Sequence, residues 1–186
     1  MIEQSAAPHP QGIRIGDGAD ADIAEIAGIY GYWVRTGLAS FELQPPTSQE
    51  MRVRRESVLR AGFPYLAARS AQNRVIGFAY CNLYRTRPAY RYACEDSIYV
   101  APDAVGLGVG SALLRALIER CESLGYRLMI AVIGDSANHA SIRLHLKLGF
   151  ERAGLLPAVG WKHSRWVDSV LMSRPLGEGG RSAPAT

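Results

Sequence analysis

Two ionisable residues and one glycine-rich stretch are the parts of this sequence best suited to chemistry. Glu95 and His145 could serve as the base and the acid of a group transfer, in either order, because an imidazole titrates near neutral pH and partial burial would raise the pKa of a glutamate. A solvated glutamate and a structural histidine are the alternatives. The glycine-rich stretch follows the β-like run Ile98-Tyr99-Val100 and precedes an apolar helical pattern. A strand, a tight glycine loop and a helix start in succession present several backbone N–H groups to a phosphate. The loop consists of Val105, Gly106, Leu107, Gly108, Val109, Gly110 and Ser111.

Two common phosphate-binding loops do not fit this stretch. A dinucleotide-binding loop spaces its glycines as glycine, one residue, glycine, two residues, glycine, with an acidic residue about 20 positions later. Here the glycines alternate, and the downstream region around Leu128 is apolar. A nucleoside triphosphate loop needs Gly-Lys followed by Ser or Thr, whereas Ser111 directly follows Gly110. A plain strand-to-helix turn remains the structural alternative.

The loop resembles the pyrophosphate loop of the GNAT-type acyl-coenzyme A N-acetyltransferases. That family places Arg/Gln-x-x-Gly-x-Gly/Ala after a strand ending in Val-x-Pro, and residues 100–102 and 108–110 match this pattern. Val105 stands where the family usually has Gln or Arg, which removes one side-chain donor to the phosphates and leaves the backbone donors. The resemblance implies acetyl-CoA as cosubstrate. It also implies that backbone N–H groups of Ile98, Tyr99 and Val100 pair with the pantetheine arm and acetyl oxygen, if this strand diverges from its neighbour.

Longer segments resemble one family in particular, the phosphinothricin and methionine sulfoximine acetyltransferases. The similarity extends over nearly all of residues 13–176. It implies that Glu95 and His145 are the catalytic pair, with the roles of acid and base open, and that Asn138 touches the cofactor. The family commonly forms homodimers, to which the aromatic segment 161–166 is expected to contribute. The segments that carry the resemblance are residues 85–100, 131–134, 141–145, 160–163 and Trp166-x-Asp168.

The substrates of that family are small amino acids with a second anionic or strongly polar group. Arg85 and Arg87, with Tyr90 and other tyrosines interleaved, have the charge to bind a carboxylate and a phosphinate or sulfoximine oxygen. Strand alternation could instead point both arginines to solvent. Phe41 is expected to form a wall of the same acceptor pocket, and Glu95 is expected to contact the acceptor amine.

Two other functions stay open at this point. One is a GNAT enzyme for a different amine, such as a protein N-terminus or a polyamine, although Arg85 and Arg87 do not favour a basic acceptor. The other is a non-catalytic coenzyme A-binding module, which the residue at Val105 permits and the presence of both Glu95 and His145 disfavours. Direct attack in a ternary complex is expected, because no cysteine lies in an evident nucleophile motif.

The composition sets further bounds on the protein. Its 186 residues, 48% hydrophobic and 20% charged, fit one globular domain. The net charge of +4 suits an anionic cofactor without implying nucleic acid. The sequence has no apolar run of membrane-spanning length and no basic-then-apolar leader, so a cytoplasmic protein without membrane contact is expected. The three cysteines lack CxxC or Cys/His spacing, which predicts buried thiols and no metal site.

Hydrophobic periodicity predicts a mixed α/β (α+β) domain over residues 12–176. The resemblance implies that this domain has a GNAT-like fold, with a mixed central sheet and helices on both faces. Residues 1–11 and 177–186 are expected to be disordered tails. Helices are predicted from Asp20 to about Thr36, from Thr47 or Ser48 to about Arg60, from the glycine loop to Gly125, and beyond Asn138. Residues 40–43 are expected to be a short extended piece. Strands are predicted at residues 13–15, 65–68, 75–80, 92–100, 128–133, 152–156 and 166–172.

Overall fold

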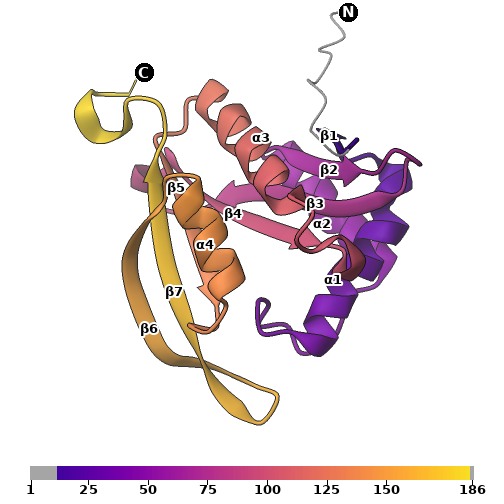
Figure 1. Cartoon of the computed structure of the whole chain (residues 1–186). Helices are drawn as coiled ribbons and strands as arrows, with labels where there is room; N and C mark the ends of the chain where they lie inside the picture. Colours follow the sequence, from indigo (N-terminus) through magenta and orange to yellow (C-terminus); the bar gives the residue numbers. More distant parts are fainter. Residues whose placement is uncertain (1–11, 185–186) are drawn as a thin grey trace, which may run out of the picture.

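A mixed sheet of seven strands forms the centre of the computed structural model, which describes residues 12–184 (Figure 1). The mixed α/β architecture expected from the sequence is confirmed. The strands are β1 Arg14–Asp17, β2 Tyr65–Arg69, β3 Val75–Leu83, β4 Ala93–Val100, β5 Leu128–Gly134, β6 Glu151–Lys162 and β7 Arg165–Pro175. The helices are α1 Ile23–Thr36, α2 Ser48–Arg60, α3 Val109–Ser123 and α4 His139–Lys147. None of the described helices is long and apolar enough to cross a membrane.

The sheet opens at its only parallel pair of described strands. The strand order is β1-β2-β3-β4-β5-β7-β6, and every pair is antiparallel except β4 and β5. The parallel pairing ends at Asp96 and Ala131, although β4 continues to Val100 and β5 continues to Gly134. Beyond that point β4 keeps its pairing with β3, and β5 keeps its pairing with β7. The 92–100 strand therefore does diverge from its neighbour β5, a feature that could not be decided from the sequence.

Helices α1 and α2 cover one face of the sheet, and α3 and α4 cover the other (Figure 1). The side chains of β3 alternate between these layers. The ring of Phe78 packs against Tyr30 of α1, whereas Gly77 faces α3 so closely that an added Cβ would lie 2.9 Å from Val109 Cγ1. The glycine thus lets α3 approach the sheet. Burial of a leucine such as Leu113, which is fully enclosed, contributes about 1.5–3 kcal/mol.

Local capping explains where the helices begin, with one correction. Helix α2 starts at the predicted capping box, in which the Thr47 hydroxyl accepts from Glu50 N–H at 3.2 Å. Helix α1 does not start at Asp20, because residues 20–22 form a 3-10 turn and α1 begins at Ile23. The Asp22 carboxylate is hydrogen-bonded to the N–H of Ala19 at 2.6 Å and holds this turn.

The late strands and the C-terminus differ from the sequence prediction. Strands β6 and β7 are longer than predicted and meet in a tight turn at His163 and Ser164, which have φ of 49° and 57°. The tail predicted from residue 177 is wrong for residues 177–184, which include the 3-10 turn Gly179–Arg181. There Arg127 donates to the carbonyls of Gly179 and Ala183. The N-terminal tail predicted at residues 1–11 lies outside the described residues.

Candidate active site

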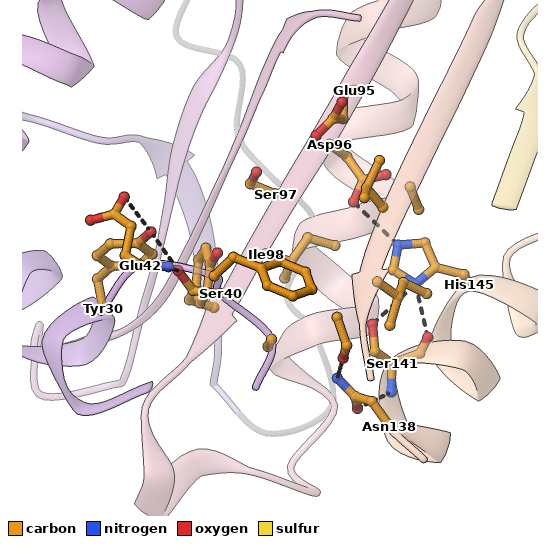
Figure 2. A pocket seen from close by; sticks show the side chains of 17 residues that line it. Tyr30, Ser40, Glu42, Glu95, Asp96, Ser97, Ile98, Asn138, Ser141 and His145 are labelled. Atoms are coloured by element: carbon orange, nitrogen blue, oxygen red, sulfur yellow. Dashed lines mark hydrogen bonds and ion pairs between the residues drawn. The ribbon is translucent and has the colours of Figure 1, made fainter. Parts of the chain in front are cut away.

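A pocket of about 490 Å³ lies where β4 and β5 diverge (Figure 2). It is lined by both predicted catalytic residues, Glu95 and His145, and by Phe41, Ile98, Tyr99 and Asn138. The sequence placed these residues on three separate segments. The fold brings them together because the open end of β4 is flanked by the residue 39–42 segment on one side and by α4 on the other.

Successive residues of β4 face opposite sides of the sheet, so the pocket has two halves. Tyr99 points to the α1 face, where its ring contacts Tyr30 at 4.8 Å between centroids, and Glu95 shares its parity. Asp96 points to the α4 face and contacts His145. The side chain of Glu95 therefore reaches the pocket from the α1 face of the sheet, whereas His145 of α4 reaches the same pocket from the opposite face.

The backbone N–H and C=O groups of successive β4 residues also alternate in direction, pointing either to the neighbouring strand β3 or to the opening between β4 and β5. In an antiparallel ladder the N–H and C=O of one residue point to the same side. The N–H of Ala101 donates to β3, and Tyr99 has the same parity, so the backbone of Tyr99 pairs with β3. The backbone groups of Ile98 and Val100 face the opening, where the Val100 carbonyl accepts from Trp33 Nε1 at 2.7 Å. This corrects the prediction for Tyr99, which contributes its side chain and not its N–H group.

The glycine loop leads from β4 into α3 and presents backbone groups. Gly106 and Gly108 have φ of 85° and 84°, a region that side chains with a Cβ rarely adopt. The first N–H in the hydrogen-bond ladder of α3 is that of Ala112, which donates to the Gly108 carbonyl at 3.0 Å. The preceding N–H groups, those of residues 109–111, have no partner within the helix, and the helix dipole adds positive charge there. Such a turn can bind a diphosphate.

His145 and Asp96 form a buried pair on the α4 side of the pocket (Figure 2). Asp96 Oδ2 lies 3.2 Å from His145 Nε2, and the two side chains are 3% and 4% exposed. His145 Nδ1 lies 2.8 Å from the backbone carbonyl of Ser141. Burial lowers the pKa of His145, but the hydrogen bond and the charge of Asp96 raise it, and the net shift is upward.

Glu95 stands half-buried on the other side of the strand. Burial raises its pKa above the ordinary value for glutamate, and the neighbouring charge of Asp96 adds to this, while Arg85 opposes it. A carboxylate of this kind accepts a proton more readily than a solvated one. Glu95 can therefore act as a base.

Asn138 has a structural role at the start of α4. Its side-chain oxygen accepts from Ser141 N–H at 3.2 Å, as predicted for a capping residue, and its amide nitrogen is 3.5 Å from the Gly134 carbonyl. Because Asn138 also lines the pocket, its side chain is accessible to a bound cofactor, as the predicted contact requires.

The segment at residues 39–42 forms the α1 side of the pocket without joining the sheet. The Tyr30 hydroxyl lies 3.0 Å from Ser40 Oγ and donates to Glu42 Oε1 at 2.9 Å. Lys162, which is buried, donates to the Ser40 carbonyl at 2.7 Å, and burial lowers the pKa of Lys162. Gly160 leaves room for Phe41, because an added Cβ would overlap its ring. The tip of the β6–β7 hairpin thus holds this segment in place.

The predicted acceptor residues of the 84–92 connection do not line the pocket. Arg85, Arg87 and Tyr90 are exposed, and the Arg85 guanidinium lies 5.0 Å from the centroid of the Tyr84 ring. The described residues that do line it include no arginine or lysine. Its charged residues are the acids Glu42, Glu95 and Asp96.

Several residues of the pocket were not predicted from the sequence. Asp96 could have been found, because it is adjacent to Glu95 and strand alternation must place it on the opposite face. Tyr30, Ser40 and Glu42 come from segments with no motif, and only tertiary packing places them here.

The three cysteines are buried, as predicted, but they also converge. Cys81 of β3, Cys94 of β4 and Cys121 of α3 have sulfur atoms within 4.8 Å of one another. Burial raises the pKa of Cys81. None of the three lines the pocket, so the described residues offer no cysteine nucleophile to a bound acyl group.

The diverging strands determine the class of protein. The unpaired backbone of β4 and the free N–H groups at the start of α3 can accept a pantetheine arm and its diphosphate, next to the pocket that Glu95 and His145 line. This is the arrangement of an N-acyltransferase that uses an acyl-coenzyme A. The chain matches the model of the Acetyltransferase (GNAT) family over residues 24–150. It belongs to that family.

Known proteins similar to this chain agree in their activity. The phosphinothricin N-acetyltransferase of Alcaligenes faecalis is 52% identical over 165 residues, 89% of this chain and 83% of the relative. The L-methionine sulfoximine/L-methionine sulfone acetyltransferase of Pseudomonas aeruginosa is 38% identical over 170 residues, 91% and 98% of the two chains. A crystal structure of a GNAT superfamily phosphinothricin acetyltransferase from Sinorhizobium meliloti in complex with AcCoA has a TM-score of 0.91 and 45% identity over 94% of each chain.

Proposed function

We propose that this protein transfers the acetyl group of acetyl-CoA to the α-amine of phosphinothricin, L-methionine sulfoximine or a related small amino acid. The attack is direct, within a ternary complex. The observation that carries the proposal is the opening between β4 and β5, which puts Glu95 and His145 into one pocket from two faces of the sheet. The activities of the similar enzymes support the choice of acceptor.

The cofactor is held mainly by backbone groups. The N–H groups of Gly106 and of residues 108–111 bind the diphosphate, while the Val105 side chain, where the family has a donor, adds none. The pantetheine arm pairs with the exposed backbone of Ile98 and Val100. Asn138 lies on the α4 side of this path.

Glu95 is the base on the acceptor side. An α-amine is largely protonated near neutral pH, so it attacks only after losing a proton. Glu95 faces the half of the pocket that contains Phe41 and Glu42, and its raised pKa suits this task. His145 is the acid on the cofactor side, where the departing thiolate, whose conjugate acid has a pKa of about 8.5, takes a proton.

Recognition of the acceptor's anionic groups is assigned to Arg85 and Arg87, which are exposed and lie outside the pocket lining. Arg85 is close enough to lower the pKa of Glu95. A second candidate function has an observation of its own: because the charged lining consists of Glu42, Glu95 and Asp96, an acceptor with an extra positive charge, such as a polyamine, would also suit the pocket.

We also propose a homodimer that works in the cytoplasm, where acetyl-CoA is available. Strand β6 is an edge strand with exposed apolar side chains, among them Leu155 and Val159, and the exposed rings of Trp161 and Trp166 lie 5.2 Å apart between centroids. Light scattering should give twice the mass of one chain, and the double variant Trp161→Ser, Trp166→Ser should give a monomer. A monomeric wild type would contradict this.

The function is tested by measuring release of the coenzyme A thiol with a panel of acceptors. Phosphinothricin, methionine sulfoximine and methionine sulfone should support turnover, with kcat/KM at least about tenfold above that for spermidine or a peptide with a free N-terminus. A preference for spermidine would favour the second candidate. Acetyl-CoA binding without thiol release from any acceptor would make the protein a binding module.

A further inference from the structure

The contacts of His145 fix where its hydrogen atoms lie. A backbone carbonyl only accepts hydrogen bonds, so the 2.8 Å contact with the Ser141 carbonyl requires a hydrogen on Nδ1. The Ser141 hydroxyl is farther from Nδ1, at 3.5 Å, and does not change this assignment. A neutral imidazole carries one N–H, so its Nε2 would then hold only a lone pair.

That lone pair would face an oxygen of Asp96. Nε2 lies 3.2 Å from Asp96 Oδ2, and two acceptors at this distance repel unless a proton lies between them. Asp96 Oδ1 is buried and has no hydrogen-bond partner among the described residues, so no other donor stabilises the carboxylate. Two buried side chains in contact thus need one shared proton (Figure 2).

The other titratable groups near Asp96 and His145 do not supply a proton to the contact between them. Glu95 is adjacent to Asp96 on β4 but faces the other side of the strand, and burial together with the charge of Asp96 raises the pKa of Glu95. The thiols of Cys94 on β4 and Cys121 on α3 feel the charge of Asp96 but do not contact His145. From the chain after α4, Phe150 packs its ring against His145 at 4.9 Å between centroids and brings no charge.

We propose that Asp96 is a positioning residue that keeps a proton on its contact with His145, so that the pair enters each catalytic cycle already loaded with the proton for the leaving thiolate. This inference rests on the proposed acetyl transfer. The protons balance: the N–H bond at His145 Nε2 breaks as the S–H bond of coenzyme A forms, and the ammonium group loses two protons in becoming an amide. One of them leaves through Glu95 to solvent, and the other restores the pair after the thiolate sulfur has taken its proton.

The test uses Asp96→Asn in the full chain. The asparagine amide can donate to Nε2 and keep the hydrogen bond, but the shared proton is lost. The ¹⁵N shifts of the His145 ring should show an imidazolium or shared-proton state at pH 7 in the wild type and a neutral ring in the variant. Asp20→Asn, which removes an exposed carboxylate paired with Arg52, is the matched control and should leave the ring unchanged.

Kinetics then show whether the proton is used. Asp96→Asn should lower kcat about 10-fold to 100-fold, with the KM for acetyl-CoA changed less than about twofold. The alkaline limb of the kcat profile should move to lower pH, because the pKa of His145 falls without Asp96. Asp96→Glu should restore part of kcat.

The outcomes separate the claims. A neutral His145 ring in the wild type at pH 7, or a ring titration identical in both proteins, overturns the inference. A lower kcat whose pH limb does not move overturns it as well, because Asp96 would then act only on the structure. A wild type without turnover on any acceptor removes the role in acetyl transfer and with it the proposed function, while the ring titration still decides the shared proton.

Discussion

Glu95 and Asp96 are consecutive residues of β4, and their side chains therefore face opposite halves of one pocket. Glu95 has the parity of Tyr99 and faces the α1 side, which the proposed mechanism gives to the acceptor. Asp96 contacts His145 at 3.2 Å on the α4 side, which the proposed mechanism gives to the cofactor. In the proposed mechanism, one strand thus separates the group that takes a proton from the pair that gives one.

The first prediction concerns the acid limb of kcat/KM. Burial and Asp96 raise the pKa of Glu95, so activity should fall, as the pH drops, at a higher value than a solvated glutamate would give. The same shift has an effect on stability. Because the folded-state pKa is raised, its contribution to stability is present below the unfolded pKa and is lost as the pH rises through the folded pKa.

Glu95→Gln should accordingly be at least as thermally stable as the wild type at pH 8. The difference in stability between the variant and the wild type should become smaller toward pH 4. Scanning calorimetry at both pH values measures this. A variant that loses stability at pH 8 would show that the carboxylate is stabilised in the fold, against the direction of its pKa shift.

The second prediction concerns the contact of Gly160 with Phe41. Gly160→Ala should displace the residue 39–42 segment, because the added Cβ overlaps the ring, and overpacking of this kind costs about 1–3 kcal/mol. The acceptor KM should rise by more than the KM for acetyl-CoA. Gly154→Ala on the same strand meets only Leu171 at 3.9 Å and serves as the control. Equal kinetic constants for Gly160→Ala and the wild type would remove Phe41 from the acceptor pocket.

The third prediction concerns Arg85 and Arg87, which are proposed to bind the anionic groups of the acceptor. The double variant Arg85→Ala, Arg87→Ala should raise the apparent KM of an anionic acceptor by about tenfold or more, through lost charged hydrogen bonds, and that of acetyl-CoA much less. Steady-state kinetics with phosphinothricin and with an uncharged analogue of similar size measure the difference. Equal increases for acceptor and cofactor would place these arginines outside acceptor binding.

Local signals in the sequence were enough to predict much of the fold. The Thr47 capping box, the Asn138 cap and the glycine loop depend on residues within a few positions of one another, and each has the predicted conformation. Helix α1 starts later than predicted because Asp20 and Asp22 are both able to stabilise a turn, and only packing selects between them.

Long-range features could not be predicted in this way. The extent to which β4 and β5 diverge depends on the pairing of β5 with β7, which is close to the C-terminus. The contact between Asp96 and His145 joins residues 49 positions apart, and the meeting of Cys81 with Cys121 joins residues 40 positions apart. Exposure of Arg85 also depends on the path of the 84–92 connection, which carries no periodic pattern.

The most direct test of the account is the turnover of Glu95→Gln with phosphinothricin at neutral pH, with acetyl-CoA affinity measured in parallel. Glu119→Gln, which changes an exposed glutamate of α3, is the control. We expect Glu95→Gln to lower kcat about 100-fold or more and to leave the Kd of acetyl-CoA within about twofold of the wild type. A kcat equal to that of the wild type would contradict it.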